Sequence, residues 1–304
     1  MNLEFKTIID SDVDLVVSLF HEVFERILPK SYYIWKYKKD NKYTSFCVYD
    51  DDVMVAHVGY KINMFIVGER EQLLASRHTS MVKDRYRGGG LYKDLIKFSI
   101  KELGKHRVSI ILAWPNINNM KASLMHEDYF PLSQLTTLTL SSISKHPKRH
   151  DKDSFNKVTA QDLLSLDSYF DVKFIKIKKD FNYLKHRYLN HPTNSYYIHT
   201  YKNGNSIIIY RICNEYLNIV DFFSPPNYLL NHLEDFIASM NDFNFTIQVW
   251  CSIFEKERYS AFLRNGFIPQ DPIFNCGYYP VSNISKETLL PHKFSFSMGD
   301  TDVF

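Results

Sequence analysis

Residues 85–103 read RYRGGGLYKDLIKFSIKEL, so three consecutive glycines stand directly before an amphipathic helical pattern. The whole chain of 304 residues holds only 10 glycines, and a run of three therefore points to a local requirement. Glycine lets backbone N–H groups approach an anion closely, and the N-terminus of a helix adds the positive end of its dipole. The stretch predicts an anion-binding turn; a plain tight turn between a strand and a helix is the alternative.

Basic residues favour phosphate as the anion, since Arg85, Arg87 and Lys93 surround the glycines. The Walker sequence G-x-x-x-x-G-K-[ST] is absent. Residues 53–66 and 71–83 are predicted to be two strands joined by a turn, which is not the βαβ unit of a dinucleotide-binding fold. The apolar run 108–113 (VSIILA) is predicted to be a buried strand.

A similar order of elements recurs in the second half of the chain. Strands are expected at 196–201, 206–212 and 217–223, followed by a helix from Pro226, a strand at 246–251 and a helix at 255–265. We interpret this as a diverged duplication, although two unrelated domains can share such an order. The predicted fold class is α+β, with two tandem domains, each a mixed, mostly antiparallel sheet flanked by helices. The expected boundaries are 1–142 for the first domain, 143–155 for a linker and 156–304 for the second domain.

Composition restricts the class of protein. Apolar residues make up 45% and charged residues 23%, with a formal charge of +3, which is ordinary for a folded protein and too balanced for a nucleic-acid partner. The four cysteines form no C-x-x-C pair, so we expect a reduced, cytoplasmic protein without a metal site. No stretch approaches 18 apolar residues and the N-terminus shows no secretory pattern, so no membrane span is expected.

The spacing R-x-x-G-x-G, formed by Arg85, Gly88 and Gly90, resembles the acyl-CoA pyrophosphate loop of the GNAT superfamily of N-acyltransferases. The resemblance implies an acyl-CoA co-substrate whose pantetheine arm runs between the diverging strands 71–83 and 108–113. It also implies the residues that contact the cofactor, which are Met81, Val82, Arg85, Arg87, Gly88, Gly89, Gly90, Leu91, Tyr92 and Asn119.

The catalytic signature of the family is only partly present. Met125 stands where the family has a tyrosine, so a tyrosine general acid is not expected. His126 and His78 are the catalytic candidates, and a reaction without a dedicated base is the alternative. In the second half, FLRNGF at 262–267 resembles a GNAT helix ending, but FFSPPN at 222–227 replaces the phosphate loop. That half is therefore expected to shape an acceptor pocket and to bind no CoA.

The tandem length, the Trp35-Lys36 element and the Gly-Asp-x-Asp sequence at 299–302 resemble bacterial nucleotide-sugar N-acyltransferases of surface polysaccharide synthesis. The resemblance implies direct acyl transfer to the amine of a nucleotide amino sugar, with thymidine diphosphate as the nucleotide. Two alternatives remain, another amine acceptor or a non-catalytic CoA-binding regulator. Core packing, structural histidines and a solvated acidic tail are the alternatives for the residues expected to bind the acceptor, which are Trp35, Lys36, Tyr37, His57, His78 and Asp300.

Overall fold

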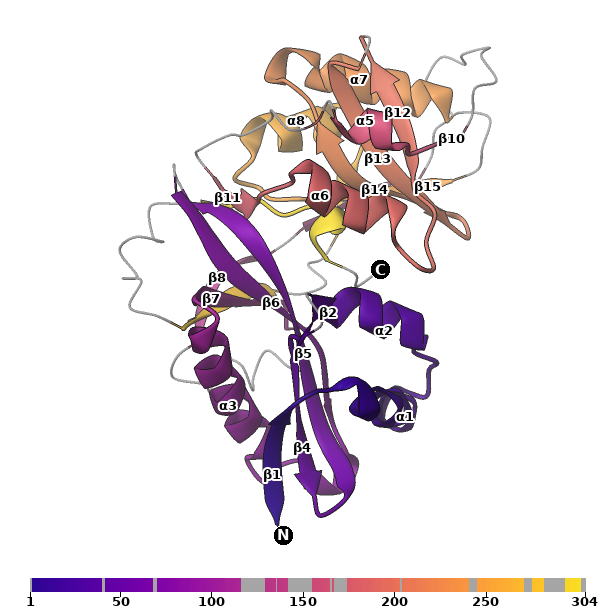
Figure 1. The fold of residues 1–304 in the computed structure, drawn as a ribbon. Coiled ribbons are helices and arrows are strands. Elements are labelled where there is room, and N and C mark those ends of the chain that lie inside the picture. The colour runs from indigo at the N-terminus through magenta and orange to yellow at the C-terminus, as the bar shows by residue number, and fades with distance from the viewer. Residues whose placement is uncertain are drawn as a thin grey trace. The chain divides into compact units, whose positions relative to one another are not determined.

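The computed structural model describes residues 2–39, 42–67, 70–115, 129–134, 136–141, 155–164, 166, 174–202, 204–240, 245–270, 275–281 and 293–301. The backbone divides into two compact units (Figure 1). Unit 1 comprises residues 1–65, 70–132 and 276–290, and unit 2 comprises residues 66–69, 133–275 and 291–304. Within the described part of the chain, no helix has the length and apolar character needed to cross a membrane.

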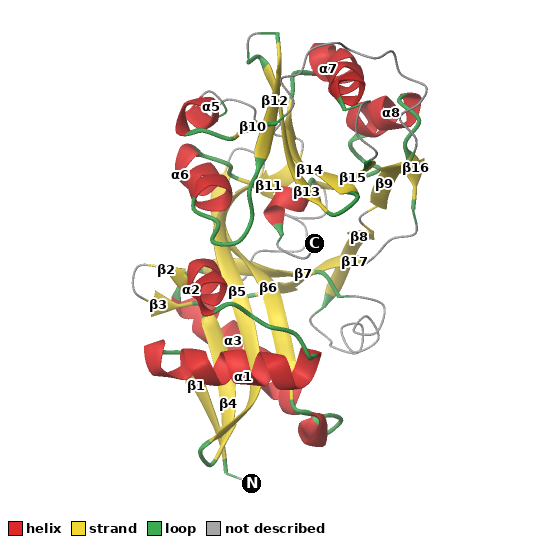
Figure 2. Ribbon diagram, turned by 90° about the vertical axis from the view of Figure 1, so that its right-hand side faces the viewer, coloured by secondary structure: helices red, strands yellow, loops and turns green. Residues whose placement is uncertain are grey.

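Unit 1 is a sheet covered by helices on both faces, with α1 and α2 on one face and α3 on the other (Figures 1 and 2). Its strands run in the order β1-β4-β5-β6-β7-β17-β8. The parallel pair is β6 with β7, whereas β1–β4, β4–β5 and β7–β17 are antiparallel. The elements are β1 (Leu3–Thr7), α1 (Val13–Phe24), α2 (Lys30–Tyr37), β2 (Lys38–Lys39), β3 (Lys42–Tyr43), β4 (Ser45–Asp50), β5 (Val53–Val67), β6 (Arg70–Val82), α3 (Leu91–Lys105), β7 (Val108–Ala113), β8 (Phe130–Gln134) and β17 (Asn275–Pro280).

Unit 2 repeats this plan, with strands in the order β10-β12-β13-β14-β15-β9-β16. Here β14 and β15 form the parallel pair, and Pro226 occupies the first turn of α7. The elements are β9 (Thr136–Leu140), β10 (Asn156–Lys157), α5 (Ala160–Leu164), β11 (Phe174–Ile177), α6 (Phe181–Leu184), a π-helical turn (Lys185–Leu189), β12 (Tyr197–Tyr201), β13 (Ser206–Cys213), β14 (Tyr216–Phe223), α7 (Pro226–Ser239), β15 (Thr246–Cys251), α8 (Lys256–Arg264), β16 (Ile268–Pro269), β18 (Lys293–Phe294) and a 3-10 turn, η4 (Met298–Asp300).

Two strands each join the sheet that is formed mainly by the other half of the sequence. Strand β9, from the first half, pairs with β15 in unit 2, and β17, from near the C-terminus, pairs with β7 in unit 1. The two units therefore differ from the expected boundaries at 142 and 156, because residues 133–141 belong to unit 2 and residues 276–290 to unit 1. Each exchanged strand pairs with a strand that lies far away in the sequence. Hydrophobic periodicity can show that a segment is a strand, but it does not identify the strand with which it pairs.

The predicted fold class is confirmed, with two mixed, mostly antiparallel sheets flanked by helices. The strand expected at 108–113 is β7, and the helix expected after the glycines is α3. Strand β1 was not predicted, and it pairs along its whole length with β4. Nearly all of the expected linker lies outside the described residues.

Candidate functional site

The glycine loop has the backbone shape that its sequence predicts. Gly88 and Gly90 have φ values of +81° and +84°, in the left-handed region that favours glycine. A Cβ atom added to Gly88, Gly89 or Gly90 would meet nothing within 4 Å, so the loop is open on its outer side. Gly90 is the N-cap of α3, whose first N–H groups have no partner inside the helix. The loop therefore presents backbone donors beside the positive end of a helix dipole.

The arginines of the loop hold its shape. Arg87 donates from Nε to the carbonyl oxygen of Val82 at 3.1 Å and pairs with Asp84 at 2.7 Å. The Arg85 guanidinium lies over the ring of Tyr86, 4.8 Å from its centroid. Both cations stand next to the glycines and add positive charge there.

The pairing of β6 with β7 ends at Ser76. β6 pairs with β7 from Leu73 to Ser76 only, opposite Val108 to Leu112, and then continues for six residues beyond the last pair. Met81 and Val82 lie in that extension, directly before the loop. The backbone of β6 past Ser76 is therefore available to a ligand that runs between the two strands.

Thr79, in the same extension, has an unusual backbone. Its φ is +47°, which is strained for a β-branched residue and costs about 1–3 kcal/mol. Two buried side chains hold it: His57 donates from Nδ1 to the Thr79 carbonyl at 2.9 Å, and the Tyr37 hydroxyl lies 2.6 Å from Thr79 Oγ1. The strained residue thus stands just past the point of divergence and is fixed from the side of α2.

His57 is a positioning residue. Because its Nδ1 donates to a carbonyl, its Nε2 accepts from the Tyr33 hydroxyl, 3.0 Å away. Burial lowers the pKa of His57 to about 4, so the ring is neutral near pH 7. Both ring nitrogens make hydrogen bonds within the protein, so this histidine has no nitrogen left for an acceptor amine.

The remaining residues of unit 1 that were predicted to bind the acceptor or to act in catalysis lie at separate positions. Lys36 is buried and lies over Tyr37, with 5.6 Å from Nζ to the ring centroid, and Trp35 is half-buried. His78 is buried and stacks on Trp114 at 5.9 Å. Asn119 and His126 lie outside the described residues.

Unit 2 contains a counterpart of the diverging strands. β14 pairs with β15 from Tyr216 to Ile219 and then continues past the last pair. Asp221 stands two residues beyond Ile219, as His78 stands two residues beyond Ser76. Pro225 precedes α7 where unit 1 has glycine, and proline has no N–H to offer.

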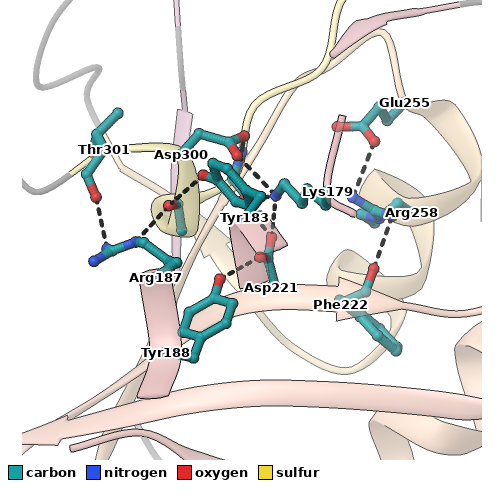
Figure 3. A network of polar contacts seen from close by, with 12 residues as sticks. Lys179, Tyr183, Arg187, Tyr188, Asp221, Phe222, Glu255, Arg258, Asp300 and Thr301 are labelled. Carbon is teal, nitrogen blue, oxygen red and sulfur yellow. Dashed lines mark hydrogen bonds and ion pairs between the residues drawn. The ribbon is translucent and has the colours of Figure 1, made fainter. Parts of the chain in front are cut away.

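A buried polar network fills this counterpart (Figure 3). The ammonium of Lys179 pairs with Asp221 and, at 2.8 Å, with Asp300, and it donates to Ser297 at 2.8 Å. The Tyr188 hydroxyl donates to the other oxygen of Asp221. Burial alone would lower the pKa of Lys179, but the two carboxylates outweigh it and the net shift is upward, so the ammonium stays charged. Burial raises the pKa of the Asp300 carboxyl.

The C-terminal segment 297–301 is held against β14 by the same network. Arg187 donates to the carbonyl oxygens of Gly299 at 2.7 Å and Thr301 at 2.9 Å. A Cβ on Gly299 would lie 2.2 Å from the Tyr188 hydroxyl, so the close approach requires glycine. On β14 itself, Arg258 of α8 donates to the carbonyl of Phe222 at 3.1 Å. The protein's own groups therefore occupy the unit 2 counterpart, and Asp300, predicted to bind substrate, is an internal ion-pair partner.

Known structures share this architecture over most of their length. A GCN5-related N-acetyltransferase from Anabaena variabilis superposes with a TM-score of 0.68 at 11% identity, covering 92% of this chain and 73% of that one. The chain has the GNAT fold. A probable N-acyltransferase from Enterococcus faecalis matches with a TM-score of 0.66 at 13% identity, covering 92% of this chain and 73% of that one.

A third similar structure carries a ligand. N-myristoyltransferase of Saccharomyces cerevisiae with bound myristoyl-CoA has a TM-score of 0.62 at 12% identity, covering 91% of this chain and 78% of that chain. At these identities the likeness establishes the fold alone. No family model matches the sequence, and no curated protein matches it.

Several residues near the diverging end of β6 were not predicted from the sequence. Nothing in the sequence predicts the positive φ of Thr79, because a left-handed backbone at a threonine depends on the residues that surround it in the fold. A signal did exist for Lys61 and Asn63, since polar residues at alternate positions of the otherwise apolar strand β5 predict one polar sheet face.

Proposed function

We propose that the chain is an acyl-CoA-dependent N-acyltransferase. The observation that carries the proposal is the open loop with left-handed Gly88 and Gly90 at the start of α3, next to the part of β6 that continues beyond its last pair with β7, at Ser76. Backbone N–H groups of residues 88–92 would hold the pyrophosphate, since the N–H of Arg87 already donates to the carbonyl oxygen of Asp84 at 3.0 Å. The backbone of β6 beyond Ser76 would hold the pantetheine arm.

The reaction is a direct transfer. The acceptor amine attacks the thioester carbonyl, the new C–N bond forms, the C–S bond breaks, and the thiolate leaves and takes up a proton. The amine must be neutral before it attacks, and its proton goes to water or to a side chain. His78 is the described candidate for that side chain, since it stands just past the divergence of β6 and β7.

Release of free CoA thiol tests the activity. We would incubate the protein with acetyl-CoA and longer acyl-CoAs in the presence of a panel of amines, and measure CoA binding by calorimetry in parallel. Amine-dependent release supports the proposal. Failure to bind CoA would contradict it, whereas tight binding without release by any amine would favour the non-catalytic regulator.

The acceptor is proposed to be a nucleotide amino sugar for surface polysaccharide synthesis. Trp35 and Lys36 are consecutive residues of α2, an aromatic ring and a cation, and these residue types suit a base and a phosphate. Stacking is worth about 1–3 kcal/mol and a charge-assisted hydrogen bond about 1.5–3 kcal/mol. The thymidine-diphosphate form of an amino sugar should therefore show a kcat/KM roughly 100-fold above that of the free sugar. Equal values for the two forms would remove the nucleotide from the proposal.

One CoA per chain is expected, despite two GNAT-like units. The unit 2 counterpart offers proline in place of a glycine loop, and Lys179, Arg258 and the C-terminal segment occupy its strand β14. Calorimetric titration with CoA should give a stoichiometry near one. A value near two, or CoA density beside residues 222–230 in a crystal, would show that unit 2 also binds the cofactor.

A further inference from the structure

A row of polar side chains lies on one sheet face of unit 1. On β5, a Cβ at Gly59 would meet the Tyr37 ring of α2 at 2.5 Å, so this position faces α2. Side chains alternate along a strand, and Lys61 and Asn63 therefore share that face. The Lys61 ammonium lies 5.4 Å from the centroid of the Trp35 ring, also on α2, which agrees with this assignment.

The neighbouring strands continue the row. On β6, Ala75 packs into the core cluster beneath α3, so Ser76 points to the opposite face, that of α2. His78 follows on the same side and stacks on Trp114, which comes directly after β7. We call Lys61, Asn63, Ser76, His78 and Trp114 the α2-side polar row.

The row is buried, and two of its groups lack partners. Lys61, Asn63, Ser76 and His78 are 5%, 8%, 0% and 6% exposed. Within the described part of the chain, the Asn63 amide nitrogen and the Ser76 hydroxyl make no hydrogen bond. Leaving a buried polar group without a hydrogen bond is costly, so each such group calls for an explanation. A bound ligand that accepts these hydrogen bonds supplies one.

The chemistry of the row selects the ligand. An amide N–H₂ and an ammonium are hydrogen-bond donors, and the hydroxyl can donate as well. Lys61 gives the α2-side polar row a positive charge, and the indole rings of Trp35 and Trp114 flank the row. Donors beside a positive charge match the oxygens of an anion, whereas a cationic or purely apolar group would leave the Asn63 N–H₂ unsatisfied.

We propose that the α2-side polar row binds the acceptor through an oxyanion, a phosphate or a carboxylate, held by Lys61 and Asn63. This rests on the proposed acyltransferase function and names the substrate class of that site. Ser76 is the last residue of β6 that pairs with β7, so the row reaches the point where the two strands diverge. An acceptor anchored by its anion on this row has its amine next to the place proposed for the thioester.

Binding measured without acyl-CoA tests the anion site separately from the reaction. Glucosamine 6-phosphate, glucosaminuronic acid and glucosamine supply the phosphate, the carboxylate and the neutral reference, and calorimetry compares their affinities. At least one anionic ligand should bind about 10–100-fold more tightly than glucosamine, as expected for one charge-assisted hydrogen bond. The stronger of the two identifies which oxyanion the site prefers.

Matched variants assign the effect to the row. Lys61→Met should abolish the preference for the anion, and Asn63→Leu, which keeps the volume, should reduce it about tenfold. Lys97→Met removes an exposed lysine from α3, on the other face of the sheet, and should leave the preference unchanged. Circular dichroism of each variant confirms folding.

The outcomes separate the two proposals. Anion-dependent binding that Lys61→Met removes supports the oxyanion site, even if no acyl transfer is found and the proposed function fails. Equal affinity for all three ligands, or a preference that survives in a folded Lys61→Met protein, overturns the oxyanion site. Efficient acylation of neutral amines would overturn it as well, while leaving the acyltransferase proposal in place.

Discussion

Replacing Lys179 by methionine is expected to lower the free energy of unfolding by about 3–5 kcal/mol, the usual cost of removing one partner from a buried ion pair. Lys179 is 15% exposed, while the carboxylates of Asp221 and Asp300 are 3% and 2% exposed. Without the ammonium, two buried carboxyl groups lose their counter-ion, and burial together with their mutual repulsion opposes ionisation of both. Urea unfolding of the wild-type and Lys179→Met proteins measures the difference.

Two further variants isolate the cause. Lys30 pairs with Asp14 on the surface, with the two side chains 51% and 74% exposed, so Lys30→Met should cost less than about 1 kcal/mol. Adding Asp300→Asn to Lys179→Met removes one of the stranded charges and should restore part of the stability. A Lys179→Met protein as stable as Lys30→Met would mean that the network does not hold the C-terminal segment.

Replacing Gly90 by valine is expected to weaken CoA binding roughly 100-fold, equivalent to two lost hydrogen bonds to charged phosphate oxygens. At a φ of +84° a β-branched residue is strongly disfavoured, so the backbone must turn away and the first N–H groups of α3 move with it. Calorimetry with CoA gives the affinities of the two proteins.

The chain offers controls for both parts of this effect. Gly204, in the β12–β13 turn, has a φ of +86° and equally open surroundings, so Gly204→Val imposes the same strain far along the sequence. It should leave CoA affinity unchanged. Gly89 does not have a positive φ, and Gly89→Ala tests a side chain in the loop without strain. Normal affinity in a folded Gly90→Val protein would refute the phosphate role of the loop.

The parts of the fold that depend on local interactions could be predicted from the sequence. Glycines before an amphipathic pattern predicted α3, Pro226 marked the start of α7, and apolar runs marked β7 and β15. In each case the residues that determine the element lie within it or directly beside it. The glycine loop was predictable for the same reason, since its shape follows from Gly88 and Gly90 themselves.

Features that depend on distant partners were not predictable. The exchange of β9 and β17 joins residues more than 100 positions apart, and either strand could have extended its own sheet. Asp300 was predicted to bind the acceptor because of its place in the Gly-Asp-x-Asp sequence, yet its partner Lys179 is over 100 residues away. His57 likewise positions Thr79 through a hydrogen bond to its carbonyl oxygen, and no sequence motif predicts the backbone conformation of Thr79.

The exchange of strands also sets the order of events during synthesis of the chain. β17 lies between β7 and β8, so the ladder of unit 1 stays open until the ribosome has made residues 275–280. From residue 142 to that point, at about 5–20 residues per second, the nascent first half waits roughly 7–28 seconds with the edge of β7 exposed. Such an edge invites pairing with other chains, so chaperone cover is most needed in this interval. Neither half can therefore complete its sheet without a strand from the other half.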